Sequence, residues 1–277
     1  MRCAWLILLG ACDGVLGFNA HPLPDATDAP PPIDAPICGK LGEACCAGAS
    51  CTDGSSCVAG TTGARCLAFA GAYEKVATTT CGAPACLANP QTGACACPAA
   101  FPSSQSVVDE GCGDPAVPQH QTAQLSLCGI SSMPPNSEWG GAYVIADIPE
   151  CEPATSPPGC LMTNPITADC TCPAGAEIVT LRVFVPGTAT ASTSCPGTVG
   201  MTDYLGGVVR VCLMPVAQPV SLYGVYQLDH DGSCRTHSSA LAGCACPTGT
   251  VASSLTSIDE LGAGFPQTQI TFCVALP

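Results

Sequence analysis

The sequence has few of the side chains that fill a large hydrophobic core. Only 5% of its 277 residues are aromatic and 10% are charged. Basic residues number 7 against 21 acidic ones, a balance that excludes nucleic-acid binding because nucleic acid needs a basic surface. No run reaches the roughly eighteen apolar residues of a transmembrane helix. We therefore expect small folded units with an acidic, soluble exterior.

The motifs of common catalytic and metal sites are also absent. The sequence contains no Cys-x-x-Cys, His-Glu-x-x-His or Gly-x-Ser-x-Gly, so thioredoxin-like and common hydrolase chemistry have no support. Residues 229–232 (Asp-His-Asp-Gly) form the most polar segment, which we interpret as a solvated turn rather than a cation site. We expect no catalytic residue, no metal and no cofactor. A dispersed hydrolase site stays an alternative, because a triad is defined by geometry and not by sequence order.

Cysteine is abundant, with 24 residues or close to 9% of the chain. This content is typical of disulfide scaffolds made for an oxidising compartment. One cysteine pattern, which ends in Cys-x-Cys-Pro, begins at Cys86, Cys160 and Cys234, 74 residues apart in both intervals. A fixed period of this kind predicts one small structural unit used three times.

Residues 38–66 precede the repeats and hold six cysteines of their own: Cys38, Cys45, Cys46, Cys51, Cys57 and Cys66. The run Cys-x6-Cys-Cys-x4-Cys resembles part of the knottin pattern, although the outer cysteines are spaced differently. Six cysteines allow about fifteen pairings, and the sequence does not choose among them. The resemblance implies a toxin, a protease inhibitor or a structural cap. The scarcity of basic residues in the module favours the cap.

The repeats are expected over residues 69–134, 139–218 and 219–277. Each has a Gly-x-Tyr phrase near its start and a short alternating segment that closes on a cysteine, and residues 178–185 form the best strand candidate. No segment combines sustained helical periodicity with helix caps. The predicted fold class is all-β, small and disulfide-rich, with the knottin-like module followed by three β-rich, disulfide-stapled repeats.

The cysteine content of the repeats predicts part of their pairing. The first two repeats have six cysteines and the third has four. Alignment on the Cys-x-Cys pair predicts the bonds Cys81–Cys112 and Cys151–Cys195, because the third repeat lacks both partners. Alignment on the tyrosines instead makes Cys86 and Cys160 the partners of Cys112 and Cys195. The remaining cysteines should form a hairpin staple and a bond to the closing strand, with Cys86–Cys95 and Cys97–Cys128 preferred in the first repeat. Their counterparts are Cys160, Cys170, Cys172 and Cys212, and Cys234, Cys244, Cys246 and Cys273.

The recurring Tyr73, Tyr143 and Tyr226 are the best candidates for a repeated ligand contact, such as stacking on sugars. The alternative, which we favour, is that each tyrosine fills the small core of its unit.

The N-terminal residues have the layout of an export signal, in which Arg2 precedes the apolar stretch 4–9. The ending Leu9-Gly10-Ala11-Cys12 resembles the lipobox of bacterial lipoproteins. The resemblance implies a signal peptide over residues 1–11 and acylation of Cys12, whereas an ordinary signal peptide cut further on is the alternative. Residues 12–37 are rich in Pro, Ala and Asp, which favours an extended tether.

The whole layout resembles the cysteine-rich lipoproteins of Gram-negative envelopes. This resemblance implies an envelope location. Our leading hypothesis is a non-enzymatic, lipid-anchored envelope protein, with the outer membrane or cell surface favoured, and with a role in adhesion, recognition or envelope structure. Its partners would be the membrane, through the lipid, and a glycan or protein ligand. The alternatives are a secreted inhibitor or toxin-like protein that acts through residues 38–66, and an extracellular hydrolase.

Overall fold

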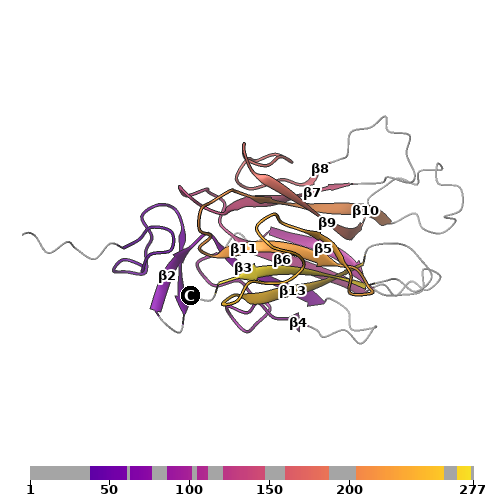
Figure 1. Cartoon of the computed structure of the whole chain (residues 1–277), viewed down its shortest axis with the longest axis horizontal. Coiled ribbons are helices and arrows are strands. Elements are labelled where there is room, and N and C mark those ends of the chain that lie inside the picture. The colour runs from indigo at the N-terminus through magenta and orange to yellow at the C-terminus, as the bar shows by residue number, and fades with distance from the viewer. Residues whose placement is uncertain are drawn as a thin grey trace, which may run out of the picture. The chain divides into compact units, whose positions relative to one another are not determined.

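The computed structural model of the chain describes residues 38–60, 63–76, 86–101, 105–111, 121–146, 160–186, 204–258 and 267–275. All regular secondary structure in these ranges is β, with fourteen strands and no helix (Figure 1). The strands form one two-stranded sheet and three four-stranded sheets, all within a compact unit that begins at residue 37. Nine disulfides join the described cysteines. The all-β, disulfide-rich prediction is confirmed.

The six-cysteine module ends in a hairpin of β1 (Ser56–Gly60) and β2 (Gly63–Leu67). Its disulfides are Cys38–Cys46, Cys45–Cys57 and Cys51–Cys66, which join the first cysteine to the third, the second to the fifth and the fourth to the sixth. The module packs on the repeats, because Val58 and Leu67 belong to their hydrophobic core and the Ser56 hydroxyl donates to the Ala100 carbonyl at 2.8 Å.

The three larger sheets share one topology. Their strands are β3 (Phe69–Val76), β4 (Cys86–Leu87), β5 (Gln105–Gly111) and β6 (Gln121–Gly129); β7 (Trp139–Ala146), β8 (Cys160–Met162), β9 (Glu177–Pro186) and β10 (Tyr204–Leu213); and β11 (Leu222–Leu228), β12 (Cys234–His237), β13 (Val251–Ile258) and β14 (Gln267–Val274). In every sheet the spatial order is second, first, fourth, third, and each neighbouring pair is antiparallel. The 74-residue period therefore corresponds to one four-stranded antiparallel sheet used three times, with its second and third strands at opposite edges.

Two disulfides of each unit repeat with the sheet. One staples the second strand to the following loop (Cys86–Cys95, Cys160–Cys170 and Cys234–Cys244), and the other ties the Cys-x-Cys loop to the fourth strand (Cys97–Cys128, Cys172–Cys212 and Cys246–Cys273). This is the pairing that the sequence favoured. The alternative partners for Cys86 and Cys160 are wrong, because both cysteines are already bonded within their hairpins. The expected bonds Cys81–Cys112 and Cys151–Cys195 lie outside the described residues and stay predictions.

Each Gly-x-Tyr phrase lies at a bulge in the first strand of its sheet, where the register shifts. Gly71 and Gly141 both have a φ of 86°, a backbone conformation that favours glycine. A Cβ added at Gly71 would lie 2.8 Å from Asn89 Oδ1, and one added at Gly141 would lie 2.0 Å from Asn164 Oδ1. Glycine is thus required both by the backbone angle and by the close approach of an asparagine.

Those asparagines attach the loop after the second strand to the first strand. Asn164 Nδ2 donates to the Gly140 carbonyl at 2.9 Å, and its Oδ1 accepts the Ile166 N–H at 2.9 Å. Asn89 makes the corresponding bonds to Ala70 and Gln91, at 2.8 Å each. Both asparagines are fully buried, so the amides replace water for backbone groups that would otherwise be unpaired. In the third unit Ser238 occupies the position of the asparagine, and its hydroxyl accepts the Val225 N–H at 3.2 Å.

The three units close on one core. A single cluster of buried residues draws side chains from all three sheets. Phe69, Trp139 and Leu222, which begin the first strands, are each no more than 2% exposed, and the Phe69 and Trp139 rings lie 4.6 Å apart. The third strands β5, β9 and β13 contact one another. Each unit is too small to bury its own apolar face, so the three stabilise one another.

Matching contacts hold neighbouring units together. Gln227, at the start of the third unit, accepts the Arg182 N–H of the second unit at 2.9 Å and donates to the Arg182 carbonyl at 3.0 Å. Glu74 occupies the corresponding place in the first unit, one residue after the Gly-x-Tyr phrase, and its Oε2 accepts the Thr256 N–H of the third unit at 2.8 Å. Arg182 and Thr256 occupy equivalent positions in the third strands of their units. Arg182 lies four residues after the residue that pairs with Cys212, and Thr256 lies four residues after the residue that pairs with Cys273. The Gln227 amide accepts from one backbone group and donates to another, whereas the Glu74 carboxylate can only accept.

We therefore expect Glu74→Gln to stabilise the protein at neutral pH. Burial raises the pKa of Glu74, although the hydrogen bond from Thr256 opposes that rise. A raised pKa in the folded state means that the protonated form stabilises the fold, and this stability is lost as pH rises from the usual carboxyl range through the raised pKa. The Gln variant should match the wild type near pH 4 and exceed it by about 1 kcal/mol at pH 7, measured by urea unfolding across pH.

The reciprocal change Gln227→Glu serves as the matched control, since it puts a carboxylate at the equivalent, fully buried position. It also removes the amide donor to Arg182 and to the Thr268 hydroxyl. This variant should lose about 2 kcal/mol at pH 7 and recover part of it in acid. A Glu74→Gln variant whose stability tracks the wild type at every pH would contradict this account.

Candidate functional site

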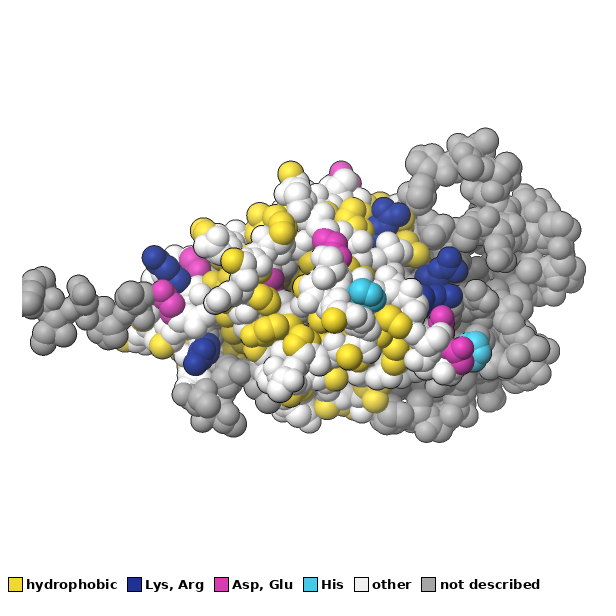
Figure 2. Space-filling model, viewed as in Figure 1, with side chains coloured by type: hydrophobic (Ala, Val, Ile, Leu, Met, Phe, Trp, Pro, Cys, Tyr) yellow, Lys and Arg dark blue, Asp and Glu magenta, His cyan; other side chains and the backbone are white. Residues whose placement is uncertain are grey.

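The exposed surface has little that identifies a site. On the face shown in Figure 2, charged side chains are few and apolar ones lie scattered among uncharged polar groups. Single exposed apolar residues are normal on soluble proteins. A concave site with convergent polar groups is more informative.

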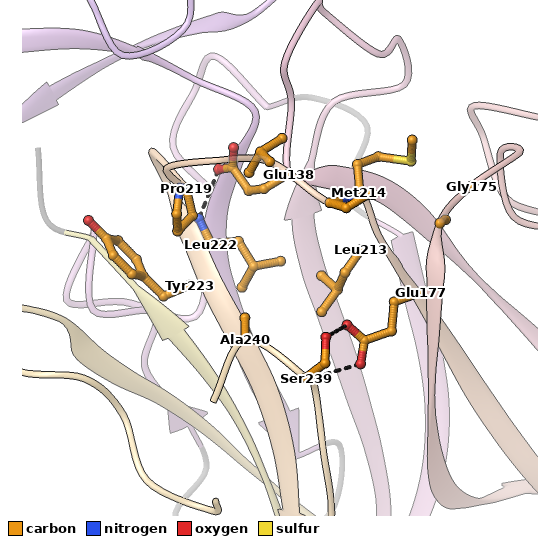
Figure 3. A pocket seen from close by; sticks show the side chains of 13 residues that line it. Glu138, Gly175, Glu177, Leu213, Met214, Pro219, Leu222, Tyr223, Ser239 and Ala240 are labelled. Atoms are coloured by element: carbon orange, nitrogen blue, oxygen red, sulfur yellow. Dashed lines mark hydrogen bonds between the residues drawn. The ribbon is translucent and has the colours of Figure 1, made fainter. Parts of the chain in front are cut away.

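One such pocket, of about 470 Å³, lies between the second and third units (Figure 3). Its wall is formed by the start of β7, the turn before β9, the link from β10 to β11 and the loop after β12. The lining residues are Glu138, Gly175, Ala176, Glu177, Leu213, Met214, Pro215, Val216, Pro219, Leu222, Tyr223, Ser239 and Ala240. Most of these side chains are apolar, and two are carboxylates.

Glu138 is the more deeply buried of the two carboxylates, at 2% exposure. It directly precedes Trp139, whose burial in the common core fixes this part of the chain. Its Oε1 accepts the N–H of Ser221 at 2.6 Å and that of Leu222 at 2.9 Å, and also accepts the Ser221 hydroxyl. Its Oε2 is buried and has no hydrogen-bond partner. Such a group is unusual, because buried polar atoms are nearly always paired.

The bonds to Oε1 show how the fold positions Glu138. The Ser221 hydroxyl donates to Glu138 of the second unit and accepts the Phe69 N–H of the first unit at 3.2 Å, so this serine links all three units. The position before the first strand is alanine in the first unit, at Ala68, and serine in the third. The carboxylate is therefore particular to the second unit. Its Oε1 has a structural role, whereas no protein group uses its Oε2.

Glu177 lies on another part of the wall, at the beginning of β9. Its two oxygens accept the Ser239 N–H and the Ser239 hydroxyl, both at 2.6 Å. Glu177 is half-buried, so its carboxylate remains open to solvent on one side. Figure 3 shows the Leu213 and Leu222 side chains between Glu138 and the Glu177–Ser239 pair. The pocket thus combines apolar walls with two acceptor groups.

The three tyrosines singled out from the sequence lie elsewhere. Tyr143 is 3% exposed and Tyr226 is 8% exposed, and both pack beside the disulfides of their own units. Tyr73 is half-buried and packs on the common core. This burial agrees with the core-filling role and leaves Tyr143 and Tyr226 almost no surface for a ligand.

The other candidate groups do not converge either. Residues 229–232 form a turn in which Ser233 donates to Asp231 and holds the pKa of Asp231 below its usual value. Within the described residues, neither His230 nor His237 hydrogen-bonds to a serine hydroxyl, and His237 Nδ1 lies 3.0 Å from the Ser238 carbonyl. The sulfurs of Cys45, Cys51 and Cys66 lie within 4.8 Å of one another, but all three are in disulfides and offer no thiolate for a metal.

Residues 1–37, which include Cys12 and the tether, lie outside the described residues. The described part of the chain includes no helix with the length and apolar character that a membrane crossing requires. No protein-family model, curated protein or solved structure matches the chain.

The sequence did not single out Glu138 or Glu177. One signal was present, since an alignment of the units on the Gly-x-Tyr phrase puts Glu138 where the other units have small residues. An acidic residue next to one of only two tryptophans, in a chain with 10% charged residues, is also out of place in a simple core-filling pattern. The pairing of Glu177 with Ser239, by contrast, joins residues 62 apart and leaves no local trace.

Proposed function

We propose that this protein is a non-enzymatic, lipid-anchored protein of the bacterial envelope that recognises a ligand outside the cytoplasm. The observation that carries the proposal is the pocket between the second and third units, with apolar walls and a buried carboxylate oxygen that the protein leaves unpaired. A largely apolar pocket with a few polar groups is the usual form of a small-ligand site. The nine disulfides support an oxidising compartment.

The six-cysteine module has a structural role in this proposal. Val58 and Leu67 lie in the common core, and the Ser132 hydroxyl donates to the Gly54 carbonyl at 3.4 Å. These contacts engage the module with the repeats, which supports a cap at the start of the folded unit rather than an independent inhibitor.

Anchoring is tested by the mass of the mature protein. Expressed from its full coding sequence in a Gram-negative host, the protein should begin at Cys12 and carry a lipid adduct there. Several acyl chains on one residue give stable membrane attachment, so the protein should sediment with membranes and resist extraction by salt. The Cys12→Ala variant should lose the adduct and leave the membrane fraction. An unlipidated mature protein that starts elsewhere would disprove the anchor.

Recognition is tested separately, by binding of the purified full-length protein to glycan arrays and to envelope extracts. Saturable binding that a pocket-filling variant, Ala240→Trp, abolishes would support the proposed function. Ala240 lines the pocket and is exposed, so the larger side chain can enter the cavity without disturbing the core. Binding unaffected by this change would place recognition elsewhere on the protein.

A further inference from the structure

The charge of the pocket narrows the chemistry of its ligand. Its thirteen lining residues include two glutamates and no lysine, arginine or histidine. Glu138 contributes a carboxylate that is 2% exposed and has one oxygen without a partner. All three hydrogen bonds that Glu138 accepts go to Oε1, so the ionised carboxylate leaves a negative potential in the wall at Oε2. A cation in the pocket would offset this potential.

The hydrogen-bonding groups of the pocket also favour a cationic ligand. Glu177 has spare lone pairs on both oxygens, because Ser239 gives each of them a single bond. The side-chain donors on the wall are the hydroxyls of Tyr223 and Ser239, and the Ser239 hydroxyl already donates to Glu177. The site therefore offers many acceptors and few donors. A carboxylate or phosphate ligand would lack donors here, whereas an ammonium group has three donors and no acceptor.

The apolar part of the wall fits a hydrocarbon stem. Leu213 and Leu222 lie between the two carboxylates in Figure 3, and Met214, Val216 and Pro219 continue the apolar lining. Aliphatic stems of cationic groups gain free energy from such surfaces while the charged end stays near acceptors.

We propose that the pocket binds a primary ammonium group on an aliphatic stem, with Glu177 as its direct partner and Glu138 as a buried charge that favours the cation. Such a group occurs in free alkylamines and in lysine side chains of peptides. This inference rests on the proposed recognition function and specifies its ligand class.

The test uses full-length protein labelled with ¹³C at the methionine methyl groups, titrated with n-hexylammonium. Met214 lines the pocket, whereas Met133 lies on the surface outside it at 42% exposure. The Met214 signal, assigned through Met214→Leu, should shift and saturate with a dissociation constant on the order of 1 mM, and the Met133 signal should not. n-Hexanol, which keeps the stem and loses the charge, should bind about tenfold more weakly, and n-hexanoate should not bind.

Two charge variants test the residues. Glu177→Gln should weaken hexylammonium binding about fivefold, and so should Glu138→Gln, whose remaining oxygen can still accept from Ser221 and Leu222. Asp231→Asn removes the same charge from an exposed turn outside the pocket and should have no effect. Unchanged far-UV circular dichroism and a free-thiol assay would show that each variant is folded and fully oxidised.

Equal affinity for hexylammonium and hexanol, or a Met214 signal that never saturates, would overturn the proposal. Tighter binding of N-acetyl-lysine N-methylamide than of hexylammonium would identify a peptide side chain as the source, and the reverse order would identify a free amine. The titration does not depend on acylation of Cys12. If the Met214 signal of a lipidated protein does not respond to hexylammonium, the ligand class alone is refuted. If the Met214 signal responds in a protein that carries no lipid, the anchor alone is refuted.

Discussion

Replacing Gly141 by alanine is expected to destabilise the protein by about 4 kcal/mol or to prevent folding. The new Cβ would lie 2.0 Å from Asn164 Oδ1, far inside contact distance, and the φ of 86° adds backbone strain. The Asn164 side chain cannot easily move away from the new Cβ, because it is fully buried and donates a hydrogen bond to the Gly140 carbonyl. The loss would be measured by denaturant unfolding, or by yield of correctly oxidised protein where the variant is too unstable to purify.

Gly249→Ala is the matched control for backbone strain. Gly249 has a φ of 87°, and an added Cβ would meet nothing within 4 Å. This substitution should cost only about 1 kcal/mol. The double variant Gly141→Ala with Asn164→Ala removes the clash, so its loss should fall well short of the sum of the single losses. Equal losses at Gly141 and Gly249, or strict additivity in the double variant, would show that the asparagine contact is not the cause.

Removal of the Cys172–Cys212 disulfide by paired alanine substitutions is expected to cost about 4 kcal/mol. The bond closes a separation of 40 residues, and Cys212 lies fully buried in one of the two inner strands of its sheet. Removal of the hairpin staple Cys160–Cys170, with a separation of 10 residues, should cost about 2.5 kcal/mol, because a shorter loop restrains the unfolded chain less.

The comparison between these two bonds is the informative measurement. Both lie in the same unit, and both variants leave the other staple in place. Thermal unfolding of the oxidised proteins should show the larger fall in Tm for the Cys172–Cys212 variant. The opposite ranking would mean that the hairpin, rather than the bond to the fourth strand, limits the stability of the unit.

Much of each unit could be predicted from the sequence, because the signals involved act over short stretches. The spacing of Cys86, Cys95 and Cys97 identified the unit, and the absence of helical periodicity excluded helices. The preference for Cys86–Cys95 and Cys97–Cys128 was correct. Cys86 and Cys95 are only 9 residues apart and bond across one loop, which leaves Cys97 to bond to the closing strand. The Gly-x-Tyr phrase was recognised as a recurring feature, but its meaning, a bulge packed against a buried asparagine, required the structure.

The sequence by itself therefore determined the unit: its period, its β character and its recurring staples. Only the tertiary structure decided that the units close on one core and that a pocket forms between two of them. The decisive contacts join residues far apart, such as Thr256 with Glu74 at a separation of 182 residues and Ser221 with Glu138 at 83. Local patterns of hydrophobicity and cysteine spacing specify which face of a strand is buried, but not which other sheet will cover it. Which sheets pack together depends on how complete side chains fit against one another. The same packing places Glu138 and Glu177 on the wall of one pocket.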